Sequence, residues 1–293
     1  MADAHLGSAP AAAAPAAPAP PALVGRAGEL ALALAVLRGG RHLLLEGPAG
    51  VGKTRLALAA CAALGRGVAR VDGDDRYSEA RLVGWFDPPA VLRAGYGPQT
   101  FTPGPLVEAM RAGAVLFVNE LNRMPEAVQN VLLPALDERR IGVPHVGEVA
   151  AAPGFAVVAT QNPVEYVATG HLSEALRDRF EHLALAWQPE AEERAIVAAE
   201  TGAPPALAAW AVRLARASRS HPAVRKGASV RAASAAAGLA LALAPDPGPA
   251  ERAAAAAAAL RTRLDLRDDA GAGFGGVLAD LLAAADGAGE DEA

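Results

Sequence analysis

Residues 47–54 have the types and the spacing of a loop that binds phosphate groups. Its glycines allow consecutive backbone N–H groups to converge on one anion. Lys53 would reach the β- and γ-phosphates of a nucleotide, and the Thr54 hydroxyl would ligate Mg²⁺. The loop consists of Gly47, Pro48, Ala49, Gly50, Val51, Gly52, Lys53 and Thr54. The alternative interpretation is a glycine-rich turn that binds no ligand.

The sequence on either side of this loop supports the phosphate-binding interpretation. The apolar run at residues 43–45 predicts a strand before the loop, and residues 55–60 favour a helix after it. The amino end of such a helix carries partial positive charge that attracts an anion. The chain contains only two lysines, Lys53 and Lys226, among its 27 basic residues. A compact ammonium fits a closed phosphate cradle better than the planar guanidinium of arginine does.

A second polar pair, Asn119 and Glu120, follows the apolar run at residues 115–118. Residues at the carboxyl end of a strand lie where open α/β sheets bind ligands. Beside a phosphate loop, Glu120 would polarise the attacking water, and the residue before it, usually aspartate, would support Mg²⁺. Asn119 brings no charge and would hold Mg²⁺ through a water, so we expect weaker Mg²⁺ binding and slow hydrolysis. Alternatively, Glu120 caps a helix that begins near Pro125.

Further polar residues stand at the ends of predicted elements. Asn162 follows the predicted strand at residues 155–160 and would contact the γ-phosphate or the attacking water, although an Asn-Pro pair is equally a turn former. Arg177 and Arg179 come just before the last predicted strand, where arginines more often form surface ion pairs than act in catalysis. Arg231 begins a helix in the carboxyl-terminal part of the chain. From the sequence, a functional role and a solvated arginine are equally good interpretations of this residue.

Short apolar runs predict a parallel sheet that helices cover on both faces. The runs lie at residues 43–45, 68–71, 115–118, 155–160 and, more weakly, 183–185. A first helix is expected from Glu29 to Leu37. After residue 188 the strand signals stop, and three or four alanine-rich helical segments follow. The predicted fold class is therefore α/β, a three-layer α/β/α parallel sheet with a P-loop, followed by a smaller all-helical lid domain.

Changes in composition predict four regions along the chain. Residues 1–22, rich in alanine and proline, would form a disordered extension. Residues 23–188 would form the α/β nucleotide-binding domain, and residues 189–285 the helical domain. Residues 286–293 would form an acidic, frayed end.

The overall composition limits the classes of function. A net charge of −5 argues against a nucleic-acid backbone as the main partner. Cys61 is the single cysteine, which rules out a disulfide within the chain, and we expect it to be a small buried residue rather than a reactive thiol. The sequence has no uninterrupted apolar stretch of membrane-spanning length and no evident secretory signal. These features predict a soluble, cytoplasmic protein.

In combination, these motifs resemble the AAA+ ATPases, specifically the MoxR-like branch related to the ATPase subunits of magnesium chelatase. The resemblance covers about residues 23–245. The loop at residues 47–54 is similar to the Walker A motif. Residues 119–125, Asn-Glu-Leu-Asn-Arg-Met-Pro, resemble the Walker B segment Asp-Glu-Ile-Asn-Arg-Ala-Pro. Residues 101–106 resemble the segment before Walker B, and residues 160–163 resemble sensor 1. Residues 172–180 resemble the arginine-finger box, and residues 227–231 resemble sensor 2.

The resemblance implies a ring, commonly a hexamer, with ATP at each interface between protomers. Arg179 would then act in trans as an arginine finger in the neighbouring site. Asn162 would act as sensor 1, and Arg231 would report the nucleotide state from the helical lid of the same protomer. Inserted segments at residues 87–100 and 141–153 would face the pore or the client. By the same analogy, a partner carrying a von Willebrand factor A domain is expected, with a role as a chaperone that matures an enzyme complex.

Two other classes of function stay open at this point. Asn119 favours a nucleotide-gated scaffold that binds ATP and barely hydrolyses it, and measured turnover would separate this scaffold from an active motor. A nucleic-acid motor or loader is disfavoured by the acidic charge and by the lack of an evident basic stripe. A salt-dependent DNA-binding assay would decide that question. A small-molecule kinase agrees poorly with the motifs, because the combination of Asn119, Glu120 and Arg179 would have no role in such an enzyme.

Overall fold

The computed structural model describes residues 15–19, 23–162, 172–268, 271 and 273–287. The described residues divide into two compact units. The first unit extends to Leu185 apart from Ala49–Val51, and the second comprises Ala49–Val51 together with the described residues from Ala186 onward. The boundary predicted between residues 188 and 189 is close to this division. Most of the predicted extension at residues 1–22 and of the acidic end at residues 286–293 lies outside the described residues.

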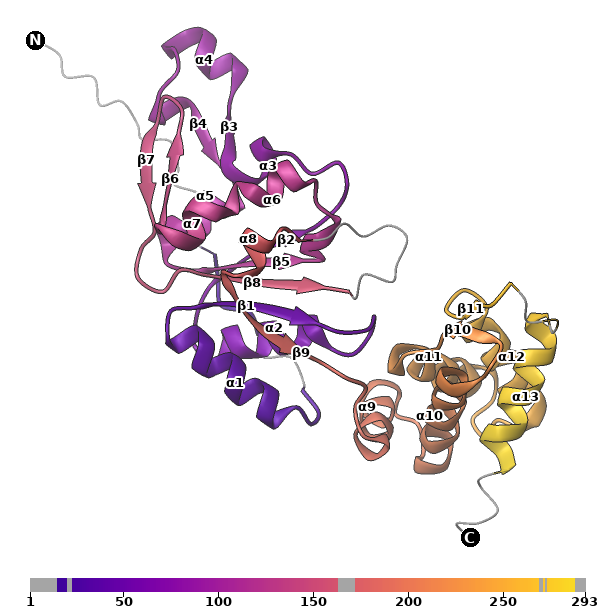
Figure 1. Cartoon of the computed structure of the whole chain (residues 1–293). Coiled ribbons are helices and arrows are strands. Elements are labelled where there is room, and N and C mark those ends of the chain that lie inside the picture. Colours follow the sequence, from indigo (N-terminus) through magenta and orange to yellow (C-terminus); the bar gives the residue numbers. More distant parts are fainter. Residues whose placement is uncertain (1–14, 20–22, 163–171, 269–270, 272, 288–293) are drawn as a thin grey trace, which may run out of the picture. The chain divides into compact units, whose positions relative to one another are not determined.

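A parallel sheet forms the centre of the first unit (Figure 1). Its five strands are β1 (His42–Glu46), β2 (Val68–Asp72), β5 (Val115–Asn119), β8 (Ala156–Gln161) and β9 (Phe180–Ala184). They are arranged in the order β2-β5-β8-β1-β9, and every neighbouring pair is parallel. The predicted parallel sheet is confirmed. Its last strand, β9, begins at Phe180, three residues before the apolar run at residues 183–185 that predicted it.

Both faces of this sheet are buried. On one face, Leu116 of β5 and Val157 of β8 share a core with Met110 of α5 (Pro105–Ala112). Successive side chains of a strand point to opposite faces, and the alternate residues Leu45 and Phe117 are buried as well. This burial on both faces explains why the strands are continuous apolar runs instead of alternating patterns.

Helices form the outer two layers of the first unit. In Figure 1, α1 and α2 lie on one side of the sheet, and α5, α6 and α7 lie on the other. Their bounds are α1 (Ala27–Arg38), α2 (Lys53–Ala63), α5 (Pro105–Ala112), α6 (Glu126–Asn130) and α7 (Leu132–Asp137). The arrangement is the three-layer α/β/α fold that the sequence predicted. The described part of this unit also contains α3 (Glu79–Val83), α4 (Pro88–Ala94) and α8 (Glu174–Arg177).

The single cysteine is a core residue of the helical layer that contains α2. Cys61 lies in α2 and is fully buried. Burial disfavours the charged thiolate and raises the pKa of the thiol to about 11. The expectation of a small buried residue at this position is confirmed.

Two antiparallel hairpins are added to the first unit (Figure 1). One pairs β3 (Gly84–Phe86) with β4 (Phe101–Pro103) and encloses α4, and the other pairs β6 (Arg140–Val143) with β7 (Gly147–Ala150). The Tyr96 and His145 rings stack with their centroids 4.9 Å apart. The segments expected as inserts at residues 87–100 and 141–153 therefore contact each other.

The second unit is mainly helical. Its helices are α9 (Glu190–Thr201), α10 (Pro205–Ser220), α11 (Val230–Leu243), α12 (Pro249–Leu260) and α13 (Phe274–Gly287). Its core consists largely of alanines and includes the fully buried Trp210. The prediction of a purely helical domain was wrong in one detail, because β10 (Val224–Lys226) and β11 (Asp265–Leu266) form an antiparallel pair. These strands are too short to leave a periodic signal in the sequence.

Among the described residues, no single helix has the length and apolar character needed to cross a membrane. Helices α9 and α10 reach this length and apolar character only when they are taken together, and the chain bends by 120° between them.

Candidate functional site

The loop at residues 47–52 joins β1 to α2 at the carboxyl edge of the sheet. Gly50 and Gly52 have φ angles of 83° and 93°. Residues with a Cβ rarely adopt such angles, so the course of the loop depends on glycine at both positions. Lys53 and Thr54 are the first residues of α2. The eight residues of the predicted phosphate loop thus form the turn after β1 and the first two residues of α2.

Lys53 places a buried cation inside this loop. The residue is only 8% exposed. Its Nζ donates hydrogen bonds to the carbonyl oxygens of Gly47 and Pro48, at 2.6 and 2.9 Å, and to Oδ1 of Asn162 at 2.9 Å. A buried charge needs such partners. Because two of them are carbonyls of the loop itself, the positive charge is held where a bound phosphate would meet it.

Asn119 ends β5 next to the first turn of α2. Its Oδ1 accepts hydrogen bonds from the hydroxyls of Thr160, at 2.9 Å, and Thr54, at 3.4 Å. The Thr160 oxygen in turn accepts the backbone N–H of Glu120 at 2.9 Å. Thr54 and Asn119 therefore bring two oxygen atoms together, and oxygen is the ligand type that Mg²⁺ prefers. The donor set fits this ion.

Glu120 has an unusual backbone conformation. Its φ and ψ angles of 56° and 51° lie in the left-handed region, which residues with side chains seldom occupy. Such outliers concentrate at functional sites. The carboxylate accepts hydrogen bonds from Nη1 of Arg123 at 2.9 Å and from Nδ2 of Asn162 at 3.4 Å. Its side chain is 32% exposed, so water can reach it.

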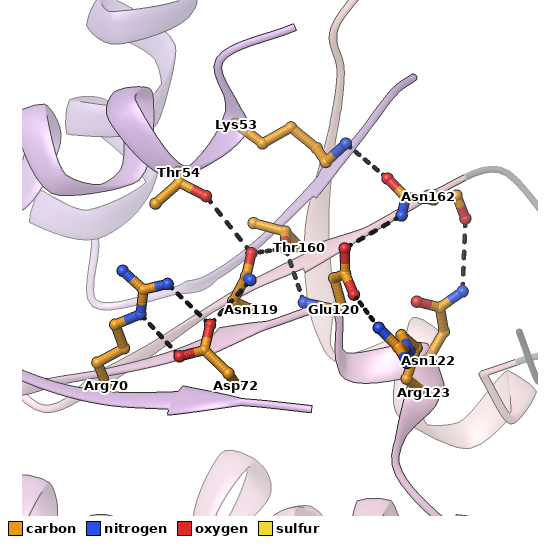
Figure 2. A network of polar contacts seen from close by, with 10 residues as sticks. All are labelled: Lys53, Thr54, Arg70, Asp72, Asn119, Glu120, Asn122, Arg123, Thr160 and Asn162. Atoms are coloured by element: carbon orange, nitrogen blue, oxygen red, sulfur yellow. Dashed lines mark hydrogen bonds and ion pairs between the residues drawn. The ribbon is translucent and has the colours of Figure 1, made fainter. Parts of the chain in front are cut away.

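Asn162 connects the lysine of the loop to this carboxylate, as Figure 2 shows. Its Oδ1 accepts from Lys53 and its Nδ2 donates to Glu120. This orientation of the amide is fixed, because an ammonium can only donate and a carboxylate can only accept. Pro163, the last residue of the predicted sensor 1 segment, lies outside the described residues.

The sequence analysis gave no role to Arg123 and Asp72, which belong to this network. Arg123 pairs with Glu120, as described above, and Asp72 ends β2 directly beside Asn119. Oδ1 of Asp72 accepts from Nδ2 of Asn119 at 2.9 Å, and Arg70 donates two further hydrogen bonds to the carboxylate (Figure 2). The hydrogen bond from Arg70, helped by that from Asn119, lowers the pKa of Asp72 despite partial burial. An acid directly after the strand predicted at residues 68–71 was the available signal.

Arg179 lies at the opposite edge of the sheet. It comes immediately before β9, and therefore at the amino ends of the parallel strands. Lys53, Glu120 and Asn162 all follow carboxyl ends of strands. The guanidinium of Arg179 forms an ion pair with Asp137 at 2.6 Å. The structure does not bring Arg179 together with the other predicted catalytic residues of the same chain.

The other predicted arginines are exposed. Arg177 is the last residue of α8. Arg231 belongs to the second unit, where it is the second residue of α11. Its expected contact with a nucleotide stays a prediction.

Comparison with known proteins places this site in a family. Residues 42–180 match the AAA domain (dynein-related subfamily). The chain therefore contains an AAA domain of this subfamily. It is 36% identical over 176 residues to the protein NorQ of Paracoccus denitrificans, which covers 59% of the chain and 63% of NorQ. It is 32% identical over 203 residues to the gas vesicle ATPase GvpN of Ancylobacter aquaticus, which covers 64% of the chain and 57% of GvpN. The chain thus spans less than two thirds of either relative.

Solved structures share the fold of this chain at low sequence identity. A variant of RuvB from Thermotoga maritima has a TM-score of 0.54 and 21% identity, covering 80% of this chain and 70% of that one. NtrX from Brucella abortus, in complex with ADP, has a TM-score of 0.55 and 18% identity, covering 77% of this chain and 52% of that one. At such identities the likeness concerns the fold alone.

Proposed function

We propose that this AAA+ protein binds ATP with Mg²⁺ at residues 47–54, hydrolyses it, and works as an oligomeric chaperone or maturation factor for a protein complex. One observation carries the proposal: Asn162 joins Lys53 to Glu120 at the carboxyl edge of the sheet. A cation for the phosphates, an acid for the attacking water and a polar side chain between them are the parts that nucleotide hydrolysis requires.

The binding roles follow from the positions of the side chains. The backbone N–H groups of the loop and Lys53 would hold the β- and γ-phosphates. Thr54 would ligate Mg²⁺ directly, and Asn119 would do so through a water. When bound, Mg²⁺ supplies positive charge that offsets the negative charge of the phosphate oxygens.

Glu120 is the proposed base of the reaction. It would accept a hydrogen bond from the attacking water and orient that water toward the γ-phosphate. The carboxylate has further acceptor sites, so it can accept this bond beside the one from Arg123 or in exchange for it. Both partners are partly exposed, at 47% for Arg123 and 32% for Glu120. An ion pair of this kind contributes only about 0–1 kcal/mol, so the exchange costs little.

An arginine from a second copy of the chain would complete the site. The five residues of β9 span about 16 Å at the usual rise per residue, so Arg179 is far from its own phosphate loop. In a head-to-tail ring, which the family resemblance suggests is a hexamer, Arg179 of one protomer would stabilise charge on the phosphoryl group bound to the next. Arg231 would contribute from the lid of the nucleotide-binding protomer.

The relatives and the family resemblance support the remaining parts of the proposal. GvpN is named as a gas vesicle ATPase. A partner with a von Willebrand factor A domain and a cytoplasmic location are expected from the MoxR-like resemblance, with neither a membrane span nor nucleic acid required for the proposed role.

A second candidate function is a nucleotide-gated scaffold with little hydrolysis. It is favoured by the uncharged Asn119 and by the pairing of Glu120 with Arg123. Binding of ATP, followed by a change in shape that recruits or releases a partner, would then be the whole cycle.

Calorimetric ATP binding and phosphate release, measured on the purified chain over a range of Mg²⁺ concentrations, separate these functions. An active motor binds ATP and releases phosphate in a Mg²⁺-dependent way. A scaffold binds ATP without appreciable release. Lys53→Ala should lose nucleotide binding in either case, because it removes the cation at the phosphates. A wild-type chain that binds no nucleotide would contradict both functions.

A further inference from the structure

The Walker B strand of this chain lacks a carboxylate at position 119, but the neighbouring strand supplies one. Asp72 and Asn119 are the last residues of β2 and β5, and they are partners in the parallel register. Nδ2 of Asn119 donates to Oδ1 of Asp72 at 2.9 Å (Figure 2). A negative charge therefore lies one side chain away from the position where the family resemblance expects it.

The hydrogen bonds around Asn119 give its amide one orientation. The Thr160 hydroxyl accepts the N–H of Glu120, so its own hydrogen is directed to Oδ1 of Asn119. On the other side, the carboxylate of Asp72 can only accept, and it requires the NH₂ group of Asn119. Both neighbours thus keep the amide oxygen on the side of Thr54.

This orientation matters because asparagine, unlike aspartate, has two different ends. The amide oxygen can accept a hydrogen bond from a metal-bound water, whereas an NH₂ group directed to that place would repel the water's hydrogens. Partners that orient metal-binding groups in this way strongly affect metal affinity.

We propose that Asp72 is a positioning residue of the Mg²⁺ site, where it orients the Asn119 amide and supplies the negative charge that position 119 lacks. The inference rests on the proposed binding of ATP and Mg²⁺ at residues 47–54. Asp72 does not itself touch the metal in this arrangement. It acts through Asn119 and through its charge.

Arg70 balances this charge. It donates to both carboxylate oxygens of Asp72, at 3.1 and 2.8 Å, and the two side chains are 48% and 59% exposed. An ion pair this exposed is weak and is easily exchanged. Arg70 therefore reduces the charge of Asp72 without removing it.

The test measures Mg²⁺ dependence by binding, not by turnover. A non-hydrolysable ATP analogue is titrated calorimetrically into the full chain, first in EDTA and then over a series of Mg²⁺ concentrations. Asp72→Asn keeps an acceptor for Asn119 and removes the charge, whereas Asp72→Ala removes both. We expect either variant to need about 10- to 100-fold more Mg²⁺ for half of the Mg²⁺ effect, with unchanged affinity in EDTA.

Two further variants make the test specific. Asp75→Asn removes the same charge from an exposed acid three residues along the chain, and it should leave the Mg²⁺ dependence as in wild type. The double variant Asp72→Asn, Asn119→Asp exchanges the two side chains across the same hydrogen bond. It should return the Mg²⁺ requirement to the wild-type value or below it.

Four results would overturn the inference. The first is an unchanged Mg²⁺ dependence in Asp72→Asn. The second is a loss as large in Asp75→Asn, which would mean a general charge effect. The third is a double variant without recovery, and the fourth is a loss of affinity that is equally large in EDTA, which would mean a structural role. If the wild-type chain binds no nucleotide at all, the proposed function fails and this inference fails with it.

Discussion

The two edges of the central sheet hold polar groups of different character. At the carboxyl edge, Lys53, Asn162 and Glu120 are joined to one another by hydrogen bonds. At the amino edge, Arg179 is paired with Asp137, beside a cavity of about 310 Å³. The first edge gathers a cation, an acid and amides around one loop. At the second edge, Arg179 stands at the opposite ends of the strands from the phosphate loop at residues 47–54.

Under the proposed function, the carboxyl edge holds most of one site, and the amino edge contributes Arg179 to the site of a second copy. A parallel sheet keeps its two edges apart by the full length of its strands, so no side-chain rearrangement within a chain unites them. Stacking of copies in a ring would bring the amino edge of one against the carboxyl edge of the next.

The largest effect is expected at the amino edge. Arg179→Ala should lower turnover by about 10³- to 10⁵-fold, because an arginine in trans stabilises charge on the transferring phosphoryl group. ATP binding by the isolated protomer should persist. Arg177→Ala is the matched control, since it removes an exposed arginine two residues away and should leave turnover unchanged. Steady-state phosphate release measures both variants, and equal losses in the two would argue for a general effect of charge.

The carboxyl edge should show the next largest effect. Glu120→Gln should retain ATP but lower turnover by about 10²-fold or more, because the amide cannot act as a base toward the attacking water. Binding calorimetry together with single-turnover phosphate release gives both quantities. Turnover at the wild-type level in this variant would rule out Glu120 as the base.

Stability at low pH should depend on the amino edge. His42 begins β1, and its Nδ1 accepts the N–H of Val157 at 2.9 Å, so the folded state requires a neutral ring. Burial lowers the pKa of His42 to about 4. In the unfolded chain the His42 ring binds a proton near pH 6.5, whereas in the folded chain it does so only near pH 4. Protonation therefore favours unfolding, and the free energy of unfolding falls as the pH decreases from 6.5 to 4. The loss should approach about 3 kcal/mol.

Denaturant unfolding of wild type and His42→Gln across this pH range measures that contribution. Glutamine keeps an acceptor and does not titrate, so the variant should lack this part of the pH dependence. Identical slopes in the two proteins would show that His42 is not the group responsible.

The smallest effect is expected for the arginine at the carboxyl edge. Arg123→Ala removes a partly exposed ion pair with Glu120, which typically contributes about 0–1 kcal/mol, so turnover should change by no more than about fivefold. Comparison with Arg179→Ala on the same assay sharpens the distinction between the edges. A loss for Arg123→Ala as large as that for Arg179→Ala would place an essential arginine within the subunit.

The sequence predicted the parts of this molecule whose signals are local. The apolar run of β5 and the spacing of the loop at residues 47–54 depend on neighbours along the chain, and both elements are found where they were expected. Asp72 was missed because its partner, Asn119, is brought close only by the pairing of β2 with β5. An acid at a strand end is also common on protein surfaces. The order of the strands, which creates this contact, could not be read from the sequence.

The edge of the sheet on which each residue lies can be deduced from the sequence. Arg179 precedes a predicted strand and Asn162 follows one, so a parallel sheet places them at opposite edges. The pairing of Glu120 with Arg123 was harder to foresee, because it depends on the left-handed conformation of Glu120. Such a conformation is unusual for glutamate and leaves no compositional trace.

Mixing two inactive variants tests most directly whether the site is shared between copies. Arg179→Ala retains Glu120, and Glu120→Gln retains Arg179. In a ring assembled from equal amounts of both, about a quarter of the head-to-tail interfaces would pair an intact Glu120 with an intact Arg179. Phosphate release should therefore recover to a clear fraction of the wild-type rate, although each variant alone is nearly inactive. No recovery, in mixtures shown by native mass measurement to co-assemble, would mean that Arg179 does not complete the site of a neighbouring subunit.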